Sequence, residues 1–269
     1  MKKKCIIYGF ITLFFLASLS GCVGPQATEY FNESYVVDDQ TILTVANING
    51  QVEITGWDRN NVSINAVKKS SFGKEELDKI QIDVSMNGNY LHIETKYLGL
   101  SSIQGSVDMN IKVPLSIHIE SVTSSNGPIT LTQTKGNTTV ESSNGGIFID
   151  TVEGYVSAET SNGQIQVKGT TGIGNLRTSN GPIIAEVADF KQNIRIETSN
   201  GAATVSLNPL LNASIEMMTS NSQITIEGIS LNIELLETTH VIGSLGSNGH
   251  EIDIRTSNGK IKLLKLLTE

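Results

Sequence analysis

Apolar and polar residues alternate along most of this chain, in short runs rich in valine, isoleucine and threonine. Thr41–Val45, Val62–Val67, Ile80–Val84 and Tyr90–Ile93 follow this period of two, which is typical of strands that bury one face. Phe72–Lys79 is the one stretch that favours a helix, and a short one. The pattern therefore predicts an all-β fold.

The second half of the chain repeats one phrase, in which a Ser-Asn-Gly turn precedes an alternating apolar run. The asparagines of the phrase are Asn126, Asn144, Asn162, Asn180, Asn200, Asn221, Asn248 and Asn258. The first three steps are 18 residues each and the next two are 20 and 21. Asn49-Gly50-Gln51-Val52 already has the same form. Self-similarity at a period of this length predicts a stacked, solenoid architecture.

One period contains an apolar strand after Asn-Gly, a second turn and a second strand that leads back to the next Asn-Gly. The sequence thus predicts a β-solenoid of the β-helix or β-roll kind, with about 18 residues and two strands per coil. Stacked at the usual strand spacing of about 4.8 Å, the apolar residues would form a continuous column. The expected inward pairs are Ile129 and Leu131, Ile147 and Ile149, Ile165 and Val167, Ile183 and Ala185, Ala203 and Val205, and Ile224 and Ile226.

Two irregularities interrupt the repeat. Pro209 cannot donate a hydrogen bond to a strand pairing, so residues 207–212 are expected to form an outward loop. The phrase is lost between Ile229 and Ser247, and the last strands, 252–255 and 260–263, carry extra charge. Charged side chains on a terminal strand discourage its free edge from pairing with another chain. These C-terminal strands are therefore expected to cap the column.

The N-terminus has the features of an export signal. Lys2, Lys3 and Lys4 precede a short apolar run, which ends at Leu19-Ser20-Gly21-Cys22. The run is shorter than the roughly 20 residues that a membrane-spanning helix needs. The ending resembles the bacterial lipobox, whose cysteine becomes the lipid-modified first residue, although an ordinary cleaved signal is the alternative.

These features divide the chain into four parts. Residues 1–22 are expected to be a lipoprotein-type signal peptide and 23–34 a linker. Residues 35–121 are expected to form an N-terminal β region with longer, irregular coils, and 122–269 the regular solenoid with its C-terminal capping strands. Cys22 is the expected lipid attachment site. The protein is therefore expected to be exported and anchored to a membrane, at the cell surface or in the periplasm.

Cysteine content and charge narrow the chemistry further. Cys5 lies inside the signal and Cys22 at its end, so no cysteine remains within the folded part for a disulfide or a thiolate metal site. Loss of the three signal lysines takes the net charge from −8 to −11. A chain this acidic is a poor partner for nucleic acid and for polybasic attachment to membranes.

The repeated asparagine has two interpretations, which the sequence leaves open. Asn-Gly tolerates positive φ at both positions and makes a compact turn, and identical asparagines one coil apart can form a ladder of amide hydrogen bonds. The alternative is a ligand-binding stripe of polar side chains, for example for a glycan. The candidates for the turn and ladder are Asn126, Asn144, Asn162, Asn180, Asn200, Asn221 and Asn258.

A carbohydrate-active enzyme on a β-helix, or a glycan-binding module, is the alternative functional class. Such an enzyme needs a carboxylate pair, and the position three before the asparagine supplies Glu141, Glu159 and Glu197, with Arg177 between them. This row is more simply a solvent-facing surface with partial charge pairing. Trp57 is either a platform for a sugar or a capping aromatic residue.

No metal, cofactor or catalytic residue is predicted. The turns lack the repeated aspartates of calcium-loaded β-rolls. A row of threonines recurs once per coil and supports ice binding only weakly: Thr160, Thr178, Thr198 and Thr219. The four histidines are scattered without metal-ligand spacing: His92, His118, His240 and His250.

The order of several short motifs resembles a widespread prokaryotic family of exported β-strand-repeat proteins. The matching stretches are 47–58 (NINGQVEITGWD), 75–82 (EELDKIQI), 109–114 (MNIKVP) and the serial SNG phrases. Members of that family are described in general terms as candidate adhesins and are otherwise of unknown function. The resemblance implies a β-solenoid, often tethered to a membrane, and transfers no catalytic residue.

The expected function is a structural, adhesive or interaction role at the cell surface without catalysis. The expected partners are the membrane, through the N-terminal lipid, and a surface glycan or envelope protein.

Overall fold

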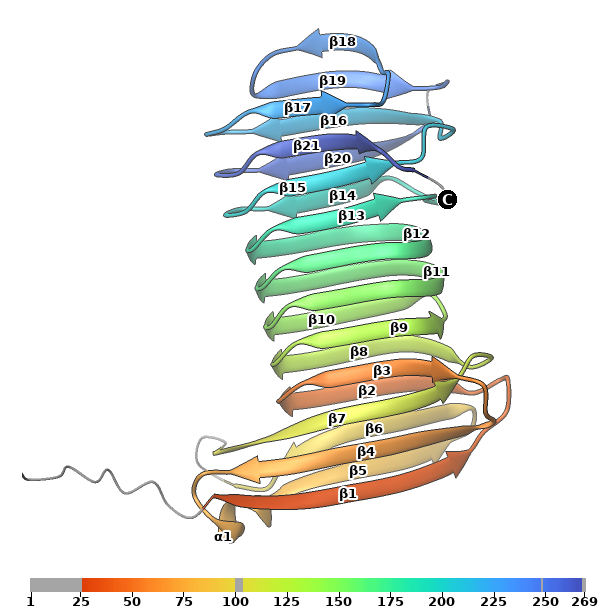
Figure 1. Cartoon of the computed structure of the whole chain (residues 1–269), viewed down its shortest axis with the longest axis vertical. Coiled ribbons are helices and arrows are strands. Elements are labelled where there is room, and N and C mark those ends of the chain that lie inside the picture. The colour runs from red at the N-terminus through yellow and green to blue at the C-terminus, as the bar shows by residue number, and fades with distance from the viewer. Residues whose placement is uncertain (1–25, 100–103, 248, 268–269) are drawn as a thin grey trace, which may run out of the picture.

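The computed structural model is an elongated stack of strands (Figure 1). It describes residues 26–99, 104–247 and 249–267. The predicted signal peptide with Cys22, and Asn248 of the repeated phrase, lie outside these residues. Within them are 21 strands and one short helix, α1 (Lys74–Leu77), inside the stretch predicted to be helical.

The strands of the first part of the chain are β1 (Ala27–Val36), β2 (Ile42–Asn49), β3 (Val52–Trp57), β4 (Asn61–Ser70), β5 (Ile80–Asn87), β6 (Tyr90–Tyr97) and β7 (Gly105–Pro114). The strands of the central part are β8 (His118–Asn126), β9 (Ile129–Lys135), β10 (Thr138–Asn144), β11 (Ile147–Asn162), β12 (Ile165–Asn180), β13 (Ile183–Val187), β14 (Ile194–Thr198) and β15 (Ala203–Leu207). The strands of the last part are β16 (Ala213–Thr219), β17 (Ile224–Glu227), β18 (Asn232–Leu236), β19 (His240–Leu245), β20 (His250–Thr256) and β21 (Ile261–Lys265).

The strand pairings define two long faces that enclose the core. Face A runs through β5, β6, β2, β8, β10, the second halves of β11 and β12, β14, β20, β16, β19 and β18. Face B runs through β1, β4, β7, β3, β9, the first halves of β11 and β12, β13, β15, β21 and β17. Each central coil contributes one parallel strand to each face, with an SNG turn joining face A to face B. The predicted all-β solenoid with two strands per coil is confirmed.

The apolar column is present along the axis between the two faces. Ile129, Leu131, Ile165 and Val167 are all fully buried, because inward residues of neighbouring coils pair in register. Ile224 and Ile226 of β17 are only partly buried, since β17 is the last strand of face B and pairs on one side only with β21.

The N-terminal end differs from the longer, irregular coils predicted for residues 35–121. β2 and β3 form a regular coil that stacks directly against β8 and β9. Beyond that coil, the β5–β6 hairpin and the β1–β4–β7 set pair antiparallel and close the end of the stack. The hairpin turns at Gly88, whose φ is 59°.

The predicted linker, 23–34, is also shorter than expected. β1 begins at Ala27 and pairs with β4 along its whole length. The strand is largely polar because it lies at the sheet edge, and Ala27, Phe31 and Tyr35 are the hydrophobic residues it packs on the core. Burial alternates along most of the strand, but Glu29 stands on the half-buried side and Tyr30 on the exposed side, so the sequence shows no clear apolar period of two.

The prediction that the last strands cap the column is wrong. β20 and β21 lie inside the stack, between the coil of β14 and β15 and the coil of β16 and β17 (Figure 1). The end is closed instead by β18 and β19, which pair antiparallel beyond β16. The C-terminal coil carries a complete SNG phrase, so its register fits both inside the stack and at its end. The phrase alone therefore does not determine where the coil lies.

The glycines of the SNG turns are required by stacking, and not by positive φ as predicted from the sequence. A Cβ on Gly163 would lie 2.2 Å from the carbonyl oxygen of Gly145, and one on Gly181 would lie 2.0 Å from that of Gly163. Only the first two glycines of the series, Gly50 and Gly127, have φ between 20° and 160°. The turns stack so closely that the backbone of each one occupies the space of a side chain on the next.

Candidate functional site

The asparagines of the SNG turns form one continuous row of side-chain hydrogen bonds. Asn162 donates from Nδ2 to Oδ1 of Asn144 at 2.8 Å and accepts from Nδ2 of Asn180 at 2.8 Å. Seven such bonds join eight residues in the order Asn49, Asn126, Asn144, Asn162, Asn180, Asn200, Asn258 and Asn221. Asn49 was not among the ladder residues predicted from the sequence, although its Asn-Gly phrase has the same form as the later ones.

The side chains of this ladder lie at the surface, and all of them except the half-buried Asn49 are exposed. Each amide inside the ladder uses one donor and one acceptor within it, and its remaining capacity faces solvent. At the two ends, Asn221 only donates, and Asn49 only accepts while its Nδ2 donates to the carbonyl oxygen of Gly105. The ladder therefore links neighbouring turns while leaving a polar edge along one side of the rod.

A second row of hydrogen bonds runs beside the ladder on the inside. Thr178 is 2 % exposed, and its hydroxyl donates to the carbonyl oxygen of Gly163 on the preceding coil. Thr160, Thr198 and Thr219 are buried in the same way and donate to other glycine carbonyls. These threonines cannot present a surface to ice, because their hydroxyls are enclosed and already paired.

The outward side of face A carries the charged row that the sequence indicated. Glu141, Glu159, Arg177 and Glu197 stand opposite one another on four neighbouring parallel strands, and the row continues to Arg255. A second outward row, two positions earlier, contributes Thr139, Ser157, Asn175 and Arg195. Sequence reasoning missed this second row, although the period of two places it on the same surface.

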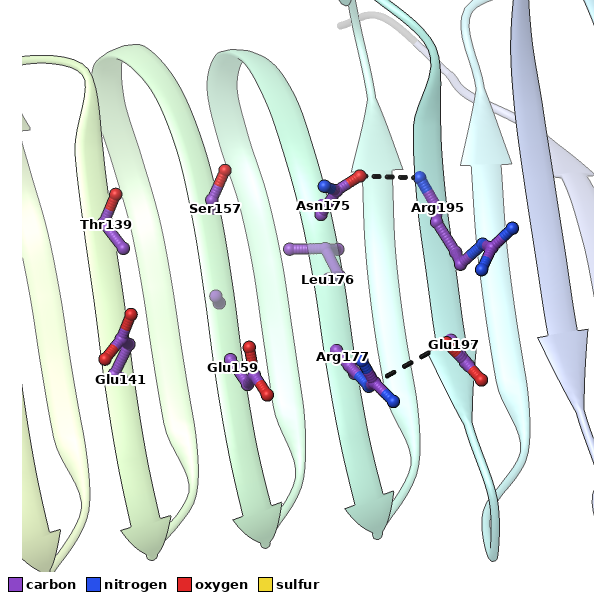
Figure 2. A pocket seen from close by; sticks show the side chains of 10 residues that line it. Thr139, Glu141, Ser157, Glu159, Asn175, Leu176, Arg177, Arg195 and Glu197 are labelled. Atoms are coloured by element: carbon purple, nitrogen blue, oxygen red, sulfur yellow. Dashed lines mark hydrogen bonds and ion pairs between the residues drawn. The ribbon is translucent and has the colours of Figure 1, made fainter.

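These two rows line a shallow hollow of about 450 Å³ on face A (Figure 2). A neighbouring hollow of about 410 Å³ shares Glu141 and Glu159 and extends toward the serines that precede the ladder. The residues that line the first hollow are Thr139, Glu141, Ser157, Ala158, Glu159, Asn175, Leu176, Arg177, Arg195 and Glu197.

Both arginines of the hollow pair with carboxylates toward the C-terminal end of the stack. Nε of Arg177 lies 3.9 Å from Oε2 of Glu197, and the Arg177 side chain is 62 % exposed. Nε of Arg195 lies 2.9 Å from Oδ2 of Asp253 on the inserted C-terminal coil. Figure 2 shows both side chains directed away from Glu141 and Glu159, and neither glutamate forms an ion pair within the described residues. The hollow therefore has a negative end and a neutralised end.

The neutralised end continues into a network around Asp253, which is 5 % exposed. Asp253 accepts from Arg195 and from Arg255, and Arg255 also contacts Glu216 at 3.1 Å. The hydrogen bond to Asp253 raises the pKa of the Arg255 guanidinium above its usual value. His240 adds a 2.9 Å contact with Glu216. This network joins the inserted coil to the coils on both sides of it.

The other residues singled out in the sequence lie apart from the hollow. The indole nitrogen of Trp57 donates to the carbonyl oxygen of Asn61 at 2.8 Å, and the Arg59 guanidinium lies 4.8 Å from the indole centre. Trp57 is thus held against the turn between β3 and β4, as expected of a capping aromatic residue. His92 stacks on Tyr90, with ring centres 5.6 Å apart.

The described residues lack two further features that would indicate a function. They contain no group of three or more histidine, cysteine, aspartate or glutamate side chains that could hold a metal ion. They also contain no helix that is long and apolar enough to span a membrane.

The fold and the hollow define a class of protein: a β-solenoid rod with an open, hydroxyl-rich and charged face. The chain belongs to the Toastrack DUF4097 family, whose sequence profile matches residues 31–264. No curated protein sequence matches the chain.

Several solved structures are similar to this one. A candidate adhesin from Bacteroides fragilis is 12 % identical, with a TM-score of 0.51 over 88 % of this chain and 97 % of that chain. A candidate cell adhesion protein from Clostridium sporogenes is 16 % identical, with a TM-score of 0.37 over 88 % and 100 %. A candidate lipid-binding protein from Parabacteroides distasonis is 12 % identical, with a TM-score of 0.42 over 87 % and 96 %. The Bacteroides structure supports the shared fold.

Proposed function

We propose that this protein is an exported, lipid-anchored, non-catalytic rod that presents face A to a glycan or protein partner at the cell surface. The observation that carries the proposal is the polar hollow across β10, β11, β12 and β14, on a face that no other element of the described residues covers. Its hydroxyl, amide, carboxylate and guanidinium groups can make directed hydrogen bonds to a polar surface.

The arrangement of the carboxylates favours binding over glycoside hydrolysis. A glycosidase places an acid and a second carboxylate on either side of the scissile bond. Glu141, Glu159 and Glu197 stand in one row on one surface, so they contact the same side of any ligand lying on face A. We therefore keep the carbohydrate-active enzyme as the lesser alternative and favour the binding module.

Two further considerations support an adhesive role. The Bacteroides fragilis protein that shares this fold is itself described as a candidate adhesin. A rod built from rigid stacked coils also holds its outward rows in fixed register, which suits contact with an extended partner.

The test compares two charge reversals on one strand. Arg177→Glu alters face A in the second half of β12, and Lys168→Glu makes the same change on face B in its first half. The signal-free protein and both variants would be applied to a glycan array and to envelope extract. We expect Arg177→Glu to change the set of retained partners and Lys168→Glu to leave it unaltered. Equal behaviour of the two variants would contradict a role for face A.

A further inference from the structure

We infer that the N-terminal end of the rod rests on the surface of a lipid bilayer, with the apolar side chains around α1 in contact with lipid. The inference rests on the proposed function, since it takes Cys22 as the lipid attachment site. We define the foot of the rod as the edge strands β1 and β5, the segment 72–79 that contains α1, and Leu98, which follows β6.

The foot is the part of the described structure that lies nearest to Cys22 along the chain. β1 begins at Ala27, and Gln26 is four positions after Cys22. Four extended residues reach at most about 14 Å. Gln26 and Phe72 line the same surface hollow, so a lipid on Cys22 would keep the region of Phe72 close to the bilayer. The other end of the stack, at β18 and β19, lies far from the foot (Figure 1).

The foot presents large apolar side chains that the described residues leave uncovered. Tyr30, Phe72 and Leu98 are 72 %, 63 % and 60 % exposed. Phe72 precedes α1, and the backbone nitrogen of Leu98 donates to the carbonyl oxygen of Lys79 just after the helix. The two side chains therefore lie near the two ends of α1. Aromatic and leucine side chains are the ones that peripheral proteins place in the membrane interface.

The apolar column is also incompletely covered at the foot. β1 and β5 are the last strands of their faces, and each pairs with one neighbour only among the described strands. α1 covers part of this end through Leu77, which is buried. A bilayer surface against the foot would remove further apolar area from water. The inward residues of the two edge strands pack on the core but stay partly exposed: Phe31, Tyr35, Ile82 and Val84.

The charges of the foot indicate an apolar contact and not an electrostatic one. Lys68 pairs with Glu29, and Lys79 pairs with Glu76, so these lysines are already neutralised. The segment 72–79 carries two lysines against three acidic residues, a net charge of −1. Electrostatic attachment to anionic lipid needs a cluster of unpaired basic residues, and the foot does not supply one within the described residues.

The backbone of the foot limits how deeply it can enter the bilayer. The outer edges of β1 and β5 carry backbone N–H and C=O groups that no other described strand pairs. Such groups are costly in hydrocarbon and must keep contact with water. The edge strands therefore stay at the level of the lipid headgroups, and only protruding side chains such as Phe72 reach the acyl chains.

A second copy of the chain is the other occupant that an apolar end could take, and the anchor favours the bilayer. Two rods that are anchored in one membrane stand with their feet on the same surface, so they cannot pair foot to foot. A rod that stands on its foot also leaves face A uncovered and open to a partner.

The experiment places one fluorophore, whose emission depends on its surroundings, on the lipid-anchored protein in phosphatidylcholine vesicles. Cys22 carries the lipid and Cys5 leaves with the signal, so an added cysteine is the one free thiol of the mature chain. Phe72→Cys labels the foot. Leu236→Cys is the matched control, because Leu236 is also apolar and 69 % exposed but lies on β18 at the far end. Tyr30→Cys supplies a second position on the foot.

Spin-labelled phosphatidylcholine, which quenches fluorophores in contact with lipid, gives the readout. We expect the labels at 72 and 30 to lose most of their emission when this lipid is included, and the label at 236 to keep it. The quenching should be the same on neutral vesicles with and without added salt, because the contact is apolar. Quenching that requires anionic lipid, or that is equal at 72 and 236, would overturn the inference.

Recovery of the protein with sedimented vesicles separates this inference from the proposed function. If the wild type is not recovered with the vesicles, the lipid anchor fails and the inference fails with it. If the protein is recovered but the labels at 72 and 30 stay unquenched, the anchor stands and the inference alone is wrong. A signal-free protein that dimerises in analytical ultracentrifugation, and becomes monomeric in Phe72→Ser, would assign the foot to a second copy and would also overturn the inference.

Discussion

Replacing one glycine of the SNG column with alanine is the sharpest test of how this rod is held together. In Gly163→Ala the new Cβ would lie 2.2 Å from the carbonyl oxygen of Gly145, whereas ordinary contacts begin at about 3.4 Å. The two turns must therefore move apart by about 1 Å. That movement stretches the 2.8 Å bond between Asn162 and Asn144 beyond hydrogen-bonding distance.

The expected cost has two parts. Forcing one methyl group into a closely packed site costs about 1–3 kcal/mol, and the lost ladder hydrogen bond adds about 1 kcal/mol. Gly163→Ala should thus lower the free energy of unfolding by about 2–4 kcal/mol. For a chain of this size, the corresponding fall in melting temperature is on the order of 10 °C.

The assay is thermal and urea unfolding followed by circular dichroism. Ser222 provides the matched control, because it occupies the glycine position in the last turn of the column, next to Asn221. That turn can shift away from its neighbour, since no further SNG turn confines it. Ser222→Ala should change stability by less than about 0.5 kcal/mol. If Gly163→Ala melts within a degree or two of the wild type, close stacking of the turns is not what requires glycine.

Three further predictions concern single side chains. Asn162→Ala should cost only about 1–2 kcal/mol in urea unfolding, because water can replace the ladder bonds of exposed amides; a loss exceeding that of Gly163→Ala would contradict this. Thr170→Val should raise the melting temperature, because the buried Thr170 hydroxyl has no hydrogen-bond partner among the described residues, whereas Thr198→Val removes a 2.8 Å bond to a backbone carbonyl and should lower it. Changes of the same sign would refute this account. Cys22→Ala should move the protein from the membrane fraction to the soluble fraction with an unchanged circular dichroism spectrum, and a wild-type N-terminal peptide without lipid mass would exclude the anchor.

The repeating part of the fold could be read from the sequence because each coil obeys the same constraints. A strict step of 18 residues leaves one way to stack Asn144, Asn162 and Asn180 in register, and the inward residues follow from the period of two. The charged row of Glu141, Glu159 and Arg177 followed from the same step. The repeat places Arg177 between Glu159 and Glu197 but does not determine which of them it pairs with. That choice depends on the packing of the side chains.

The ends of the rod escaped prediction for a different reason. β1 is a polar edge strand whose partner, β4, is set by antiparallel pairing and not by a repeat. At the other end, the SNG phrase at Asn258 fits equally well beside the phrase at Asn200 or beyond the phrase at Asn221. Identical phrases carry no information about their order, so the insertion of the C-terminal coil could not be deduced from them.

Disulfide cross-linking can decide the order of those coils directly. Thr198 and Thr219 both pair with Thr256, so the serines that follow them, Ser199 and Ser220, lie on either side of Ser257. In a Cys22→Ala background, Ser199→Cys/Ser257→Cys places two cysteines about one strand spacing apart, near 4.8 Å, within the Cα range for a disulfide.

Ser199→Cys/Ser220→Cys places its cysteines two spacings apart, about 10 Å, which is beyond that range. All three serines are exposed and accessible to oxidant. Mass spectrometry of the oxidised, digested protein should therefore find the 199–257 cross-link and not the 199–220 cross-link. The reverse result would mean that the coils stack in chain order, and the network that joins Arg195, Asp253 and Glu216 could not then form, because it requires the C-terminal coil to lie between the other two.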